Sequence, residues 1–316
     1  MGLTNFPNGL TSFGSVVHGG SVPTLGREFH VRKTTDTGYA AWKRAMDHTV
    51  RGGGNSVHTT INSAIAAASD YDTIWVYPGQ YKETASIAIT QNSLRLLAVQ
   101  TGPDKALLRT EIRQHGNVET PCITVEGCHN VEIAGFRITP YSSASGIGIQ
   151  IGNTADTYGT WIHDNYFYAV AGGHQCTHIK YGNASYNADS TYINDNYFLG
   201  GGGQGASAAN YTIEHVLGYF SVIKNNTFIC YGNTTDSITI KVTYSSETIQ
   251  RLQILDNRFF AYEVGGVLCI DVGGTVDGHT FVDGNHFVGF TANANCYDWD
   301  ADNSGLNYLG HTAISS

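Results

Sequence analysis

Apolar and polar residues alternate in short runs along most of the chain, and one six-residue pattern returns at a nearly constant interval. The pattern is an aliphatic residue, two variable positions, Asn, one variable position and Phe, and it occurs five times between residues 162 and 287. Its asparagines are 31, 30, 31 and 28 residues apart, and a degenerate copy at 131–136 precedes them. A repeat of this size indicates stacked units, and its β-branched runs indicate strands. The chain is therefore predicted to be an all-β protein, a parallel β-helix.

The repeated residues suit a stack of strands about 4.8 Å apart, in which equal positions of successive turns form ladders. An Asn side chain can donate and accept between neighbouring turns, and Asn tolerates the left-handed backbone of sharp corners. The Phe two positions further on lies on the same side and is predicted to stack in the core. We therefore expect a structural ladder, rather than a binding surface, formed by Asn165, Asn196, Asn226, Asn257 and Asn285 with Phe136, Phe167, Phe198, Phe228, Phe259 and Phe287.

Other alternating runs are predicted to supply the remaining walls of each turn. Residues 146–151, 237–242 and 267–272 have the alternation of half-buried strands, and each follows the motif Phe at a similar distance. Residues 72–81 and 93–99 have the character of first turns. Together these segments predict about eight turns and a rod of roughly 40 Å.

An amphipathic segment precedes the first predicted strand. Ile61, Ala64, Ile65 and Ala68 share one face of a helix, which would cover the open end of the stack. The run T-I-N-S-A-I-A-A-A…D-T-I-W-V-Y-P-G-Q-Y-K-E, at 60–83, resembles the opening of the pectin lyase-like right-handed β-helix superfamily. The resemblance covers about residues 55 to 300 and implies a right-handed, single-stranded β-helix with a capping helix. That superfamily includes lyases, hydrolases, epimerases, phage tailspikes and non-enzymatic virion proteins, so the fold leaves the activity open.

The first 26 residues have a different composition. They are rich in turn-forming residues and lack both the charged start and the apolar run of an export signal. The string N-F-P-N-G-L-T-S-F-G is similar to the openings of structural proteins of tailed bacteriophages, in which an arm precedes a β-rich body. The resemblance implies an assembly arm; an ordinary extension packed on the rod is the alternative. The residues of the predicted arm are Phe6, Pro7, Asn8, Gly9 and Phe13.

The charge and the cysteine content of the chain exclude several classes of binding partner and site. Lys and Arg number 17 against 26 Asp and Glu, a formal net charge of −9, and no basic stripe is present, which argues against nucleic-acid binding. No apolar run has the length of a membrane span. The six cysteines form no Cys-x-x-Cys pair, so a zinc site or redox motif is not expected. Free thiols would suit assembly in a reducing cytoplasm, and disulfides are the alternative.

Candidate catalytic carboxylates occur in the repeat itself. Asp164, Asp195 and Asp256 precede the motif Asn and are the fallback candidates, since glycosidases use paired carboxylates. They follow the repeat, whereas a catalytic site should interrupt it, and Asp before Asn is ordinary turn chemistry. The histidines, among them His178 and His215, show no metal spacing and are expected at the surface. We therefore predict no enzymatic activity and no cofactor.

One segment near the C-terminus, residues 300–311, partly matches the sequence pattern of a calcium-binding loop. Asp300, Asp302 and Ser304 stand at its first, third and fifth positions, but His311 replaces the Glu that should occupy position twelve. The bidentate ligand is missing, so a simple turn is favoured and no metal site is predicted.

These observations predict a domain organisation. Residues 1–26 are an anchoring arm, residues 27–54 a linking or capping region, residues 55–300 the β-helix and residues 301–316 a C-terminal cap or tail.

The phage resemblance favours a structural virion protein, a capsid decoration or head-spike protein on the capsid surface, assembled in the host cytoplasm. Its expected partners are the major capsid protein or other virion proteins, and copies of itself in a homotrimer. One alternative is a tailspike depolymerase, a hydrolase or lyase acting on polysaccharide. Another is a non-catalytic spike that binds a host surface glycan through tyrosines such as Tyr166, Tyr168, Tyr181, Tyr186 and Tyr197.

Overall fold

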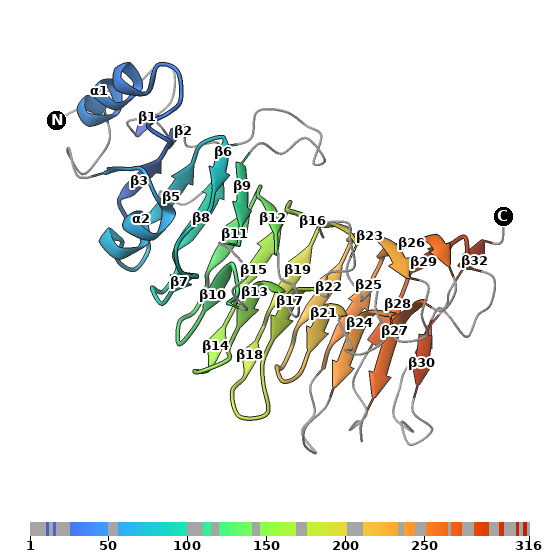
Figure 1. Ribbon diagram of the computed structural model, residues 1–316. Helices are drawn as coiled ribbons and strands as arrows, with labels where there is room; N and C mark the ends of the chain where they lie inside the picture. The colour runs from blue at the N-terminus through green and yellow to red at the C-terminus, as the bar shows by residue number, and fades with distance from the viewer. Residues whose placement is uncertain are drawn as a thin grey trace, which may run out of the picture.

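The computed structural model contains three long parallel sheets that run side by side along a rod (Figure 1). It describes residues 11–12, 15–16, 26–49, 56–99, 110–114, 120–140, 146–168, 176–200, 211–232, 237–243, 251–264, 267–273, 281–290, 297–299, 308–309 and 312–314. Within these residues the three sheets have eight, eleven and nine strands. Each turn of chain adds one strand to each sheet in succession, which is the architecture of a parallel β-helix.

The strands of each sheet pair in parallel with those of the turns before and after. The eight-stranded sheet contains β7 (Ile87–Ile89), β10 (Ile123–Val125), β13 (Gly146–Ile151), β17 (Cys176–Tyr181), β21 (Tyr211–His215), β24 (Ser237–Thr243), β27 (Val267–Gly273) and β30 (Tyr297–Trp299). The eleven-stranded sheet contains β3 (Glu28–Val31), β4 (Val57–His58), β5 (Thr73–Val76), β8 (Arg95–Ala98), β11 (Glu132–Ala134), β15 (Trp161–His163), β19 (Tyr192–Asn194), β22 (Val222–Lys224), β25 (Gln253–Leu255), β28 (Phe281–Asp283) and β31 (Tyr308–Leu309). The nine-stranded sheet contains β6 (Gly79–Tyr81), β9 (Thr110–Arg113), β12 (Arg137–Thr139), β16 (Tyr166–Tyr168), β20 (Tyr197–Leu199), β23 (Thr227–Gly232), β26 (Arg258–Val264), β29 (His286–Val288) and β32 (Thr312–Ile314).

Short pairs complete the sheet structure. The strands β14 (Thr157–Tyr158) and β18 (Ala188–Asp189) pair in parallel, and β1 (Thr11–Ser12) and β2 (Ser15–Val16) pair antiparallel.

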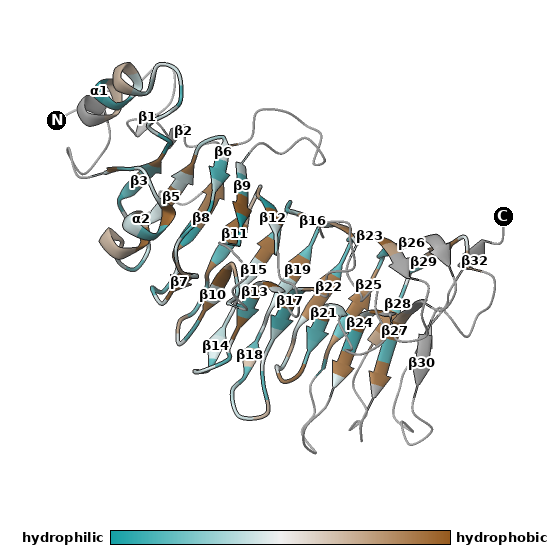
Figure 2. Cartoon of the chain, in the orientation of Figure 1, coloured by the Kyte–Doolittle hydropathy of each residue, from teal (hydrophilic) through white to brown (hydrophobic). Residues whose placement is uncertain are grey.

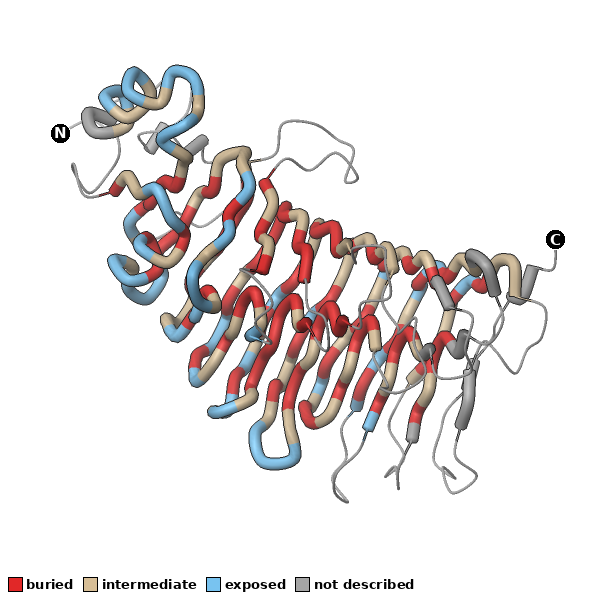
Figure 3. The backbone as a smooth tube through the Cα atoms, in the orientation of Figure 1, coloured by how far each residue is buried: buried red, intermediate tan, exposed pale blue. Residues whose placement is uncertain are grey.

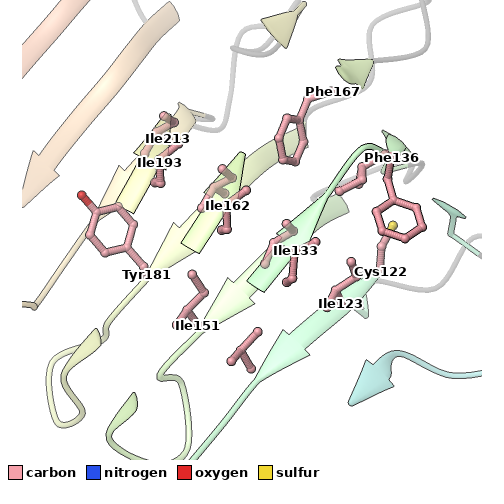
Figure 4. Close-up of a cluster of buried hydrophobic side chains, with 14 of the residues drawn as sticks. Cys122, Ile123, Ile133, Phe136, Ile151, Ile162, Phe167, Tyr181, Ile193 and Ile213 are labelled. Carbon is pink, nitrogen blue, oxygen red and sulfur yellow. The ribbon is translucent and has the colours of Figure 1, made fainter. Parts of the chain in front are cut away.

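The core lies inside the coil and is built from inward-pointing residues of the strands, which alternate with outward ones in strands such as β7, β9 and β10. Ile133, Ile162 and Ile193 are paired in register on successive turns and are fully buried. Figure 4 shows these side chains one above another, as expected when the repeat length equals one turn. Figures 2 and 3 show the same alternation of apolar with polar and of buried with more exposed residues along the strands.

The repeated Asn stands at the corner that follows five strands of the eleven-stranded sheet, β15, β19, β22, β25 and β28. Each of the five motif asparagines is buried, and in every successive pair the side-chain oxygen of one accepts from the backbone N–H of the Asn one turn earlier, at 2.9–3.0 Å. The amide nitrogen donates to the carbonyl of the aliphatic residue that opens the preceding motif. The ladder thus satisfies backbone groups that the bend removes from the sheet.

The residue before the Asn has a left-handed backbone. Asp164, Asp195, Asn225 and Asp256 have φ between 52° and 56°, and Gly284 has φ 65°. Asn, Asp and Gly tolerate this conformation best, which explains why only these types occur at the position.

The motif phenylalanines from Phe167 onward form a stack through the core. The prediction that Phe136 belongs to this row is wrong: Ile138 pairs with Phe167, and Phe136 takes the place of the Asn, its N–H donating to Asn165 Oδ1 at 3.0 Å. Ring centroids from Phe167 to Phe287 are 4.7, 4.7, 4.8 and 5.0 Å apart, and the rings are within 12° of parallel. Their spacing equals the strand spacing, so each turn adds one ring.

The two helices of the described residues lie at the N-terminal end of the rod (Figure 1). Helix α2 (Ile61–Ala67) begins at Thr60, whose side chain accepts from the N–H of Ser63, and buries Ile61, Ala64 and Ile65. Trp42, from helix α1 (Tyr39–Thr49), packs edge-on against Tyr77. Helix α2 covers the end of the core as the sequence predicts.

The predicted fold class is confirmed, and the figure of about eight turns holds only approximately because the sheets differ in strand number. The stack includes β3, which pairs with β5 and begins before residue 55. It also includes β32, which pairs with β29 beyond residue 300. The remaining domain limits stay a prediction. Neither described helix is long and apolar enough to cross a membrane.

Candidate functional site

The outward face of the eleven-stranded sheet carries an unusual set of side chains. Strands β8, β11, β15 and β19 place aliphatic residues inward, so the intervening positions point outward. One outward row consists of Arg95, Glu132, Trp161 and Tyr192, which are paired in register on four successive turns. In the next two turns the row continues with Val222 and Gln253.

This row lies in an open groove of about 720 Å³. The corners that precede the strands form one edge, and there Ser93, Asn130, Gly159 and Ser190 all have a positive φ between 52° and 71°. The residues that line the groove are Ser93, Arg95, Asn130, Val131, Glu132, Gly159, Trp161, Ser190, Tyr192 and Asn194.

Four charged or titratable side chains form a connected network at the groove. Arg95 Nε donates to Glu132 Oε2 at 2.5 Å, and Arg95 Nη2 donates to Glu132 Oε1 at 3.3 Å. His163 Nε2 lies 3.1 Å from Glu132 Oε1, and His163 Nδ1 lies 2.9 Å from Asp164 Oδ2. The imidazole is thus held between two carboxylates, and Glu132 is held between two cations when His163 is protonated.

The network determines the charge of its members. Partial burial would raise the pKa of Glu132, but hydrogen bonds from His163 and Arg95 and the charge of Arg95 outweigh it and hold the pKa at about 2. Partial burial would lower the pKa of His163, but its bonds to Glu132 and Asp164 outweigh burial and raise that pKa. Glu132 is therefore an anion at any ordinary pH, and His163 stays protonated to a higher pH than a free histidine.

Two large aromatic side chains project from adjacent turns beside this network. Trp161 and Tyr192 are 43% and 46% exposed, which makes them two of the exposed large aromatic residues in the described part of the chain. Trp161 stacks on His163 at 3.9 Å between ring centroids and donates from Nε1 to Asn194 Oδ1 at 2.5 Å. The indole is therefore held in place, with its free surface on the groove.

The fallback carboxylates occupy other positions. Asp164, Asp195 and Asp256 lie at the left-handed corners and do not line the groove. Asp164 bonds His163, Asp195 accepts from the side chain of Asn194 at 2.6 Å, and Lys224 lies 3.5 Å from Asp256. Asp164 thus belongs to the network, through its bond to His163.

Several other predicted residues can be placed. Tyr166 and Tyr181 are buried, Tyr168 and Tyr197 are partly buried and Tyr186 is exposed, so the tyrosines do not form one platform. The arm residues and the calcium candidates Asp300, Asp302 and Ser304 lie outside the described residues. Within the described part of the chain, no group of three or more His, Cys, Asp or Glu could hold a metal ion.

Two histidines expected at the surface are in the interior. His178 and His215 are fully buried, and burial lowers the pKa of each to about 4, so both are neutral inside the coil. In β17 the neighbours His178 and Ile179 are both fully buried, so strict alternation does not hold there and could not have placed His178.

Sequence reasoning did not single out Glu132, Arg95 or Trp161 as candidate site residues. Glu132 stands in the degenerate motif copy, at an outward position where the following turns have Trp161, Tyr192 and Val222. This outward position holds a different residue in each of these turns, so Glu132, unlike the fallback aspartates, is a carboxylate that does not recur along the rod.

Comparison with solved structures defines the class of fold. The chain is similar to a pectin methylesterase in complex with a hexasaccharide, at 12% identity and TM-score 0.56, with 91% of this chain and 89% of that chain covered. It is also similar to a pectin methylesterase from carrot, at 11% identity and TM-score 0.51, with 94% and 85% covered. An alginate lyase from Paenibacillus sp. str. FPU-7 matches at 14% identity and TM-score 0.43, over 78% of this chain and 96% of that one. No protein-family model and no curated protein matches the chain.

The chain therefore has the pectin lyase-like, right-handed parallel β-helix fold. The prediction that it is not an enzyme is contradicted, since the solved structures that share its fold are enzymes acting on carbohydrate. Among carboxylates, that prediction considered only the aspartates of the repeated corner and did not consider Glu132, which lies at a position that differs from turn to turn. At 11–12% identity the likeness shows the fold alone, so the reaction has to be argued from the groove.

Proposed function

We propose that the chain is a polysaccharide depolymerase, a glycoside hydrolase that binds its polymer in the groove of the eleven-stranded sheet. The observation that carries the proposal is the pairing of exposed Trp161 and Tyr192 on adjacent turns with ionised Glu132 in the same groove. Exposed aromatic side chains that gather beside convergent polar groups mark binding sites for ligands that have both apolar and hydroxyl surfaces. Sugar rings are such ligands.

The repeat suggests how the polymer lies. Strands of successive turns are about 4.8 Å apart, which is close to the length of one sugar ring. A polysaccharide running parallel to the rod would place successive sugars over successive turns, one over Trp161 and the next over Tyr192. Ser93, Asn130 and Ser190 along the corner edge then lie where sugar hydroxyls can bond.

Glu132 is the group proposed to face the reacting sugar. Hydrolysis breaks the bond between the anomeric carbon and the bridging oxygen; water supplies the hydroxyl of one product and the proton of the other. The transition state carries positive charge at the anomeric carbon, which an adjacent carboxylate stabilises. With a pKa of about 2, Glu132 is always available as that anion and is a poor base, which disfavours the lyase alternative. His163 and Arg95 act as positioning residues.

The virion role remains a separate proposal, supported by the resemblance of the N-terminal arm. A depolymerase carried on a phage tail would unite both interpretations, and the arm could then bind other virion proteins.

Activity on a panel of neutral and acidic polysaccharides, measured as new reducing ends, tests the proposal. We expect Glu132→Gln to lower kcat about 100-fold or more and Trp161→Ala to raise KM, with the circular dichroism spectrum unchanged. The matched control is Asp256→Asn, which removes a carboxylate outside the groove at a backbone conformation that Asn tolerates. Full activity of Glu132→Gln, or its loss in Asp256→Asn, would refute the assignment.

A further inference from the structure

Charge in the groove indicates the class of polysaccharide that the site accepts, an inference that rests on the proposed function. The two titratable charged residues that line the groove are Arg95 and Glu132, which neutralise each other. No further Lys or Arg lines it among the described residues. A ligand in the groove therefore meets aromatic, hydroxyl and amide groups with no spare positive charge.

The surroundings of the groove are acidic. Asp164 and Asp195 lie at the corners that follow β15 and β19, and the whole chain has a net charge of −9. Among the described residues further along the chain, Lys224 pairs with Asp256, and Arg251 stacks on Phe220 with its guanidinium 5.2 Å from the ring centroid. Neither lines the groove.

An acidic sugar would bind here at a cost. Its carboxylate would lose water without gaining a cation, or would have to take Arg95 from Glu132. The second course leaves Glu132 with His163 as its one remaining partner in the network and brings two carboxylates close together. A neutral sugar requires neither change.

We propose that the groove accepts a neutral polysaccharide and rejects polyuronates. The same pairing that keeps Glu132 ionised for catalysis thus sets specificity, because Arg95 is occupied. Breaking the Arg95–Glu132 pair should therefore increase binding of acidic sugars. In Glu132→Gln the Arg95 guanidinium loses its carboxylate partner and becomes available to the carboxylate of an acidic sugar.

Titration calorimetry of the full chain with hexasaccharide probes tests this inference. One set is neutral, made of unsubstituted glucan, mannan and galactan hexasaccharides; the other is acidic, made of galacturonate and alginate hexasaccharides. We expect a neutral probe to bind at least about tenfold more tightly than either acidic probe, with affinity insensitive to salt. Glu132→Gln should raise the affinity for an acidic probe about tenfold, and salt should reverse that gain.

Controls separate the inference from the function beneath it. Trp161→Ala should weaken the neutral probe about tenfold, while Tyr186→Ala, which removes an exposed Tyr outside the groove, should not. If an acidic probe binds more tightly than the neutral probes, and if Arg95→Gln and added salt weaken that binding, the inference about specificity is overturned. The groove would still be the polysaccharide-binding site in that case. If no probe binds, or Trp161→Ala changes nothing, the proposed function fails and the inference with it.

Discussion

Replacing Asn196 by Ala would test how the Asn ladder stabilises the rod. The Asn196 amide nitrogen donates to Ile162 O at 2.9 Å, Asn194 O at 3.0 Å and Asn226 Oδ1 at 3.1 Å. Its oxygen accepts from Asn165 N at 3.0 Å and Asn165 Nδ2 at 3.2 Å. Alanine removes all five bonds and leaves the buried Asn165 N–H without that acceptor.

The expected loss follows from these bonds. An orphaned buried donor costs about 1–3 kcal/mol, and a typical lost hydrogen bond about 1 kcal/mol, so we expect Asn196→Ala to lower the free energy of unfolding by roughly 3–5 kcal/mol. Urea unfolding followed by circular dichroism measures the total. Hydrogen exchange at the Asn165 amide measures the local effect, and its protection should fall most.

Two comparison variants decide whether the ladder is responsible. Asn285→Ala, where the described ladder ends, removes three such bonds and should cost less than Asn196→Ala. Gln253→Ala alters an exposed side chain on a strand and should change stability little. If Asn196→Ala shifts the urea midpoint no further than Gln253→Ala, the argument that the ladder satisfies essential backbone groups is refuted.

Other predictions concern pH, backbone and thiols. Because the folded pKa of His163 is raised, its contribution to stability is full below about pH 6.5 and is lost as pH rises through the folded pKa; His163→Asn should abolish that slope in unfolding measured against pH. Because the folded pKa of Glu132 is lowered from 4.5 to about 2, its contribution is present above pH 4.5 and is lost as pH falls toward 2, a loss that Glu132→Gln should remove. Gly182→Ala should destabilise the protein by several kcal/mol because the new Cβ would lie 1.9 Å from a backbone oxygen, whereas Gly38→Ala, also at positive φ, meets nothing within 4 Å; similar melting temperatures would contradict this. Burial raises the pKa of the Cys122 thiol to about 12, so a thiol reagent should modify it in urea and not in the native protein.

The fold could be predicted from the sequence because each copy of the repeat is a short, contiguous segment that specifies its own local structure. One pattern marks the strand, the corner and the inward side, and stacking copies it along the rod, so the Asn and Phe ladders follow from the period. Asp164, Asp195 and Asp256 were also placed at corners by the period alone, and their positive φ explains the choice of residue.

The candidate site depended on turns that depart from the repeat. Arg95 lies 37 residues before Glu132, and Glu132 lies 31 residues before His163, so the spacing of the first pair differs from the period and does not reveal the contact. Only the strand register places Arg95 beside Glu132 and sets Trp161 in the same outward row.

The sequence by itself determined the parallel β-helix, its helical cap and the ladders in its core, because each depends on side chains repeated at equal intervals. The tertiary structure decided the groove, the ion pair within it and the charge states of Glu132 and His163. These depend on burial and on neighbours from other turns, and a pKa has no value in a linear sequence until folding supplies that environment.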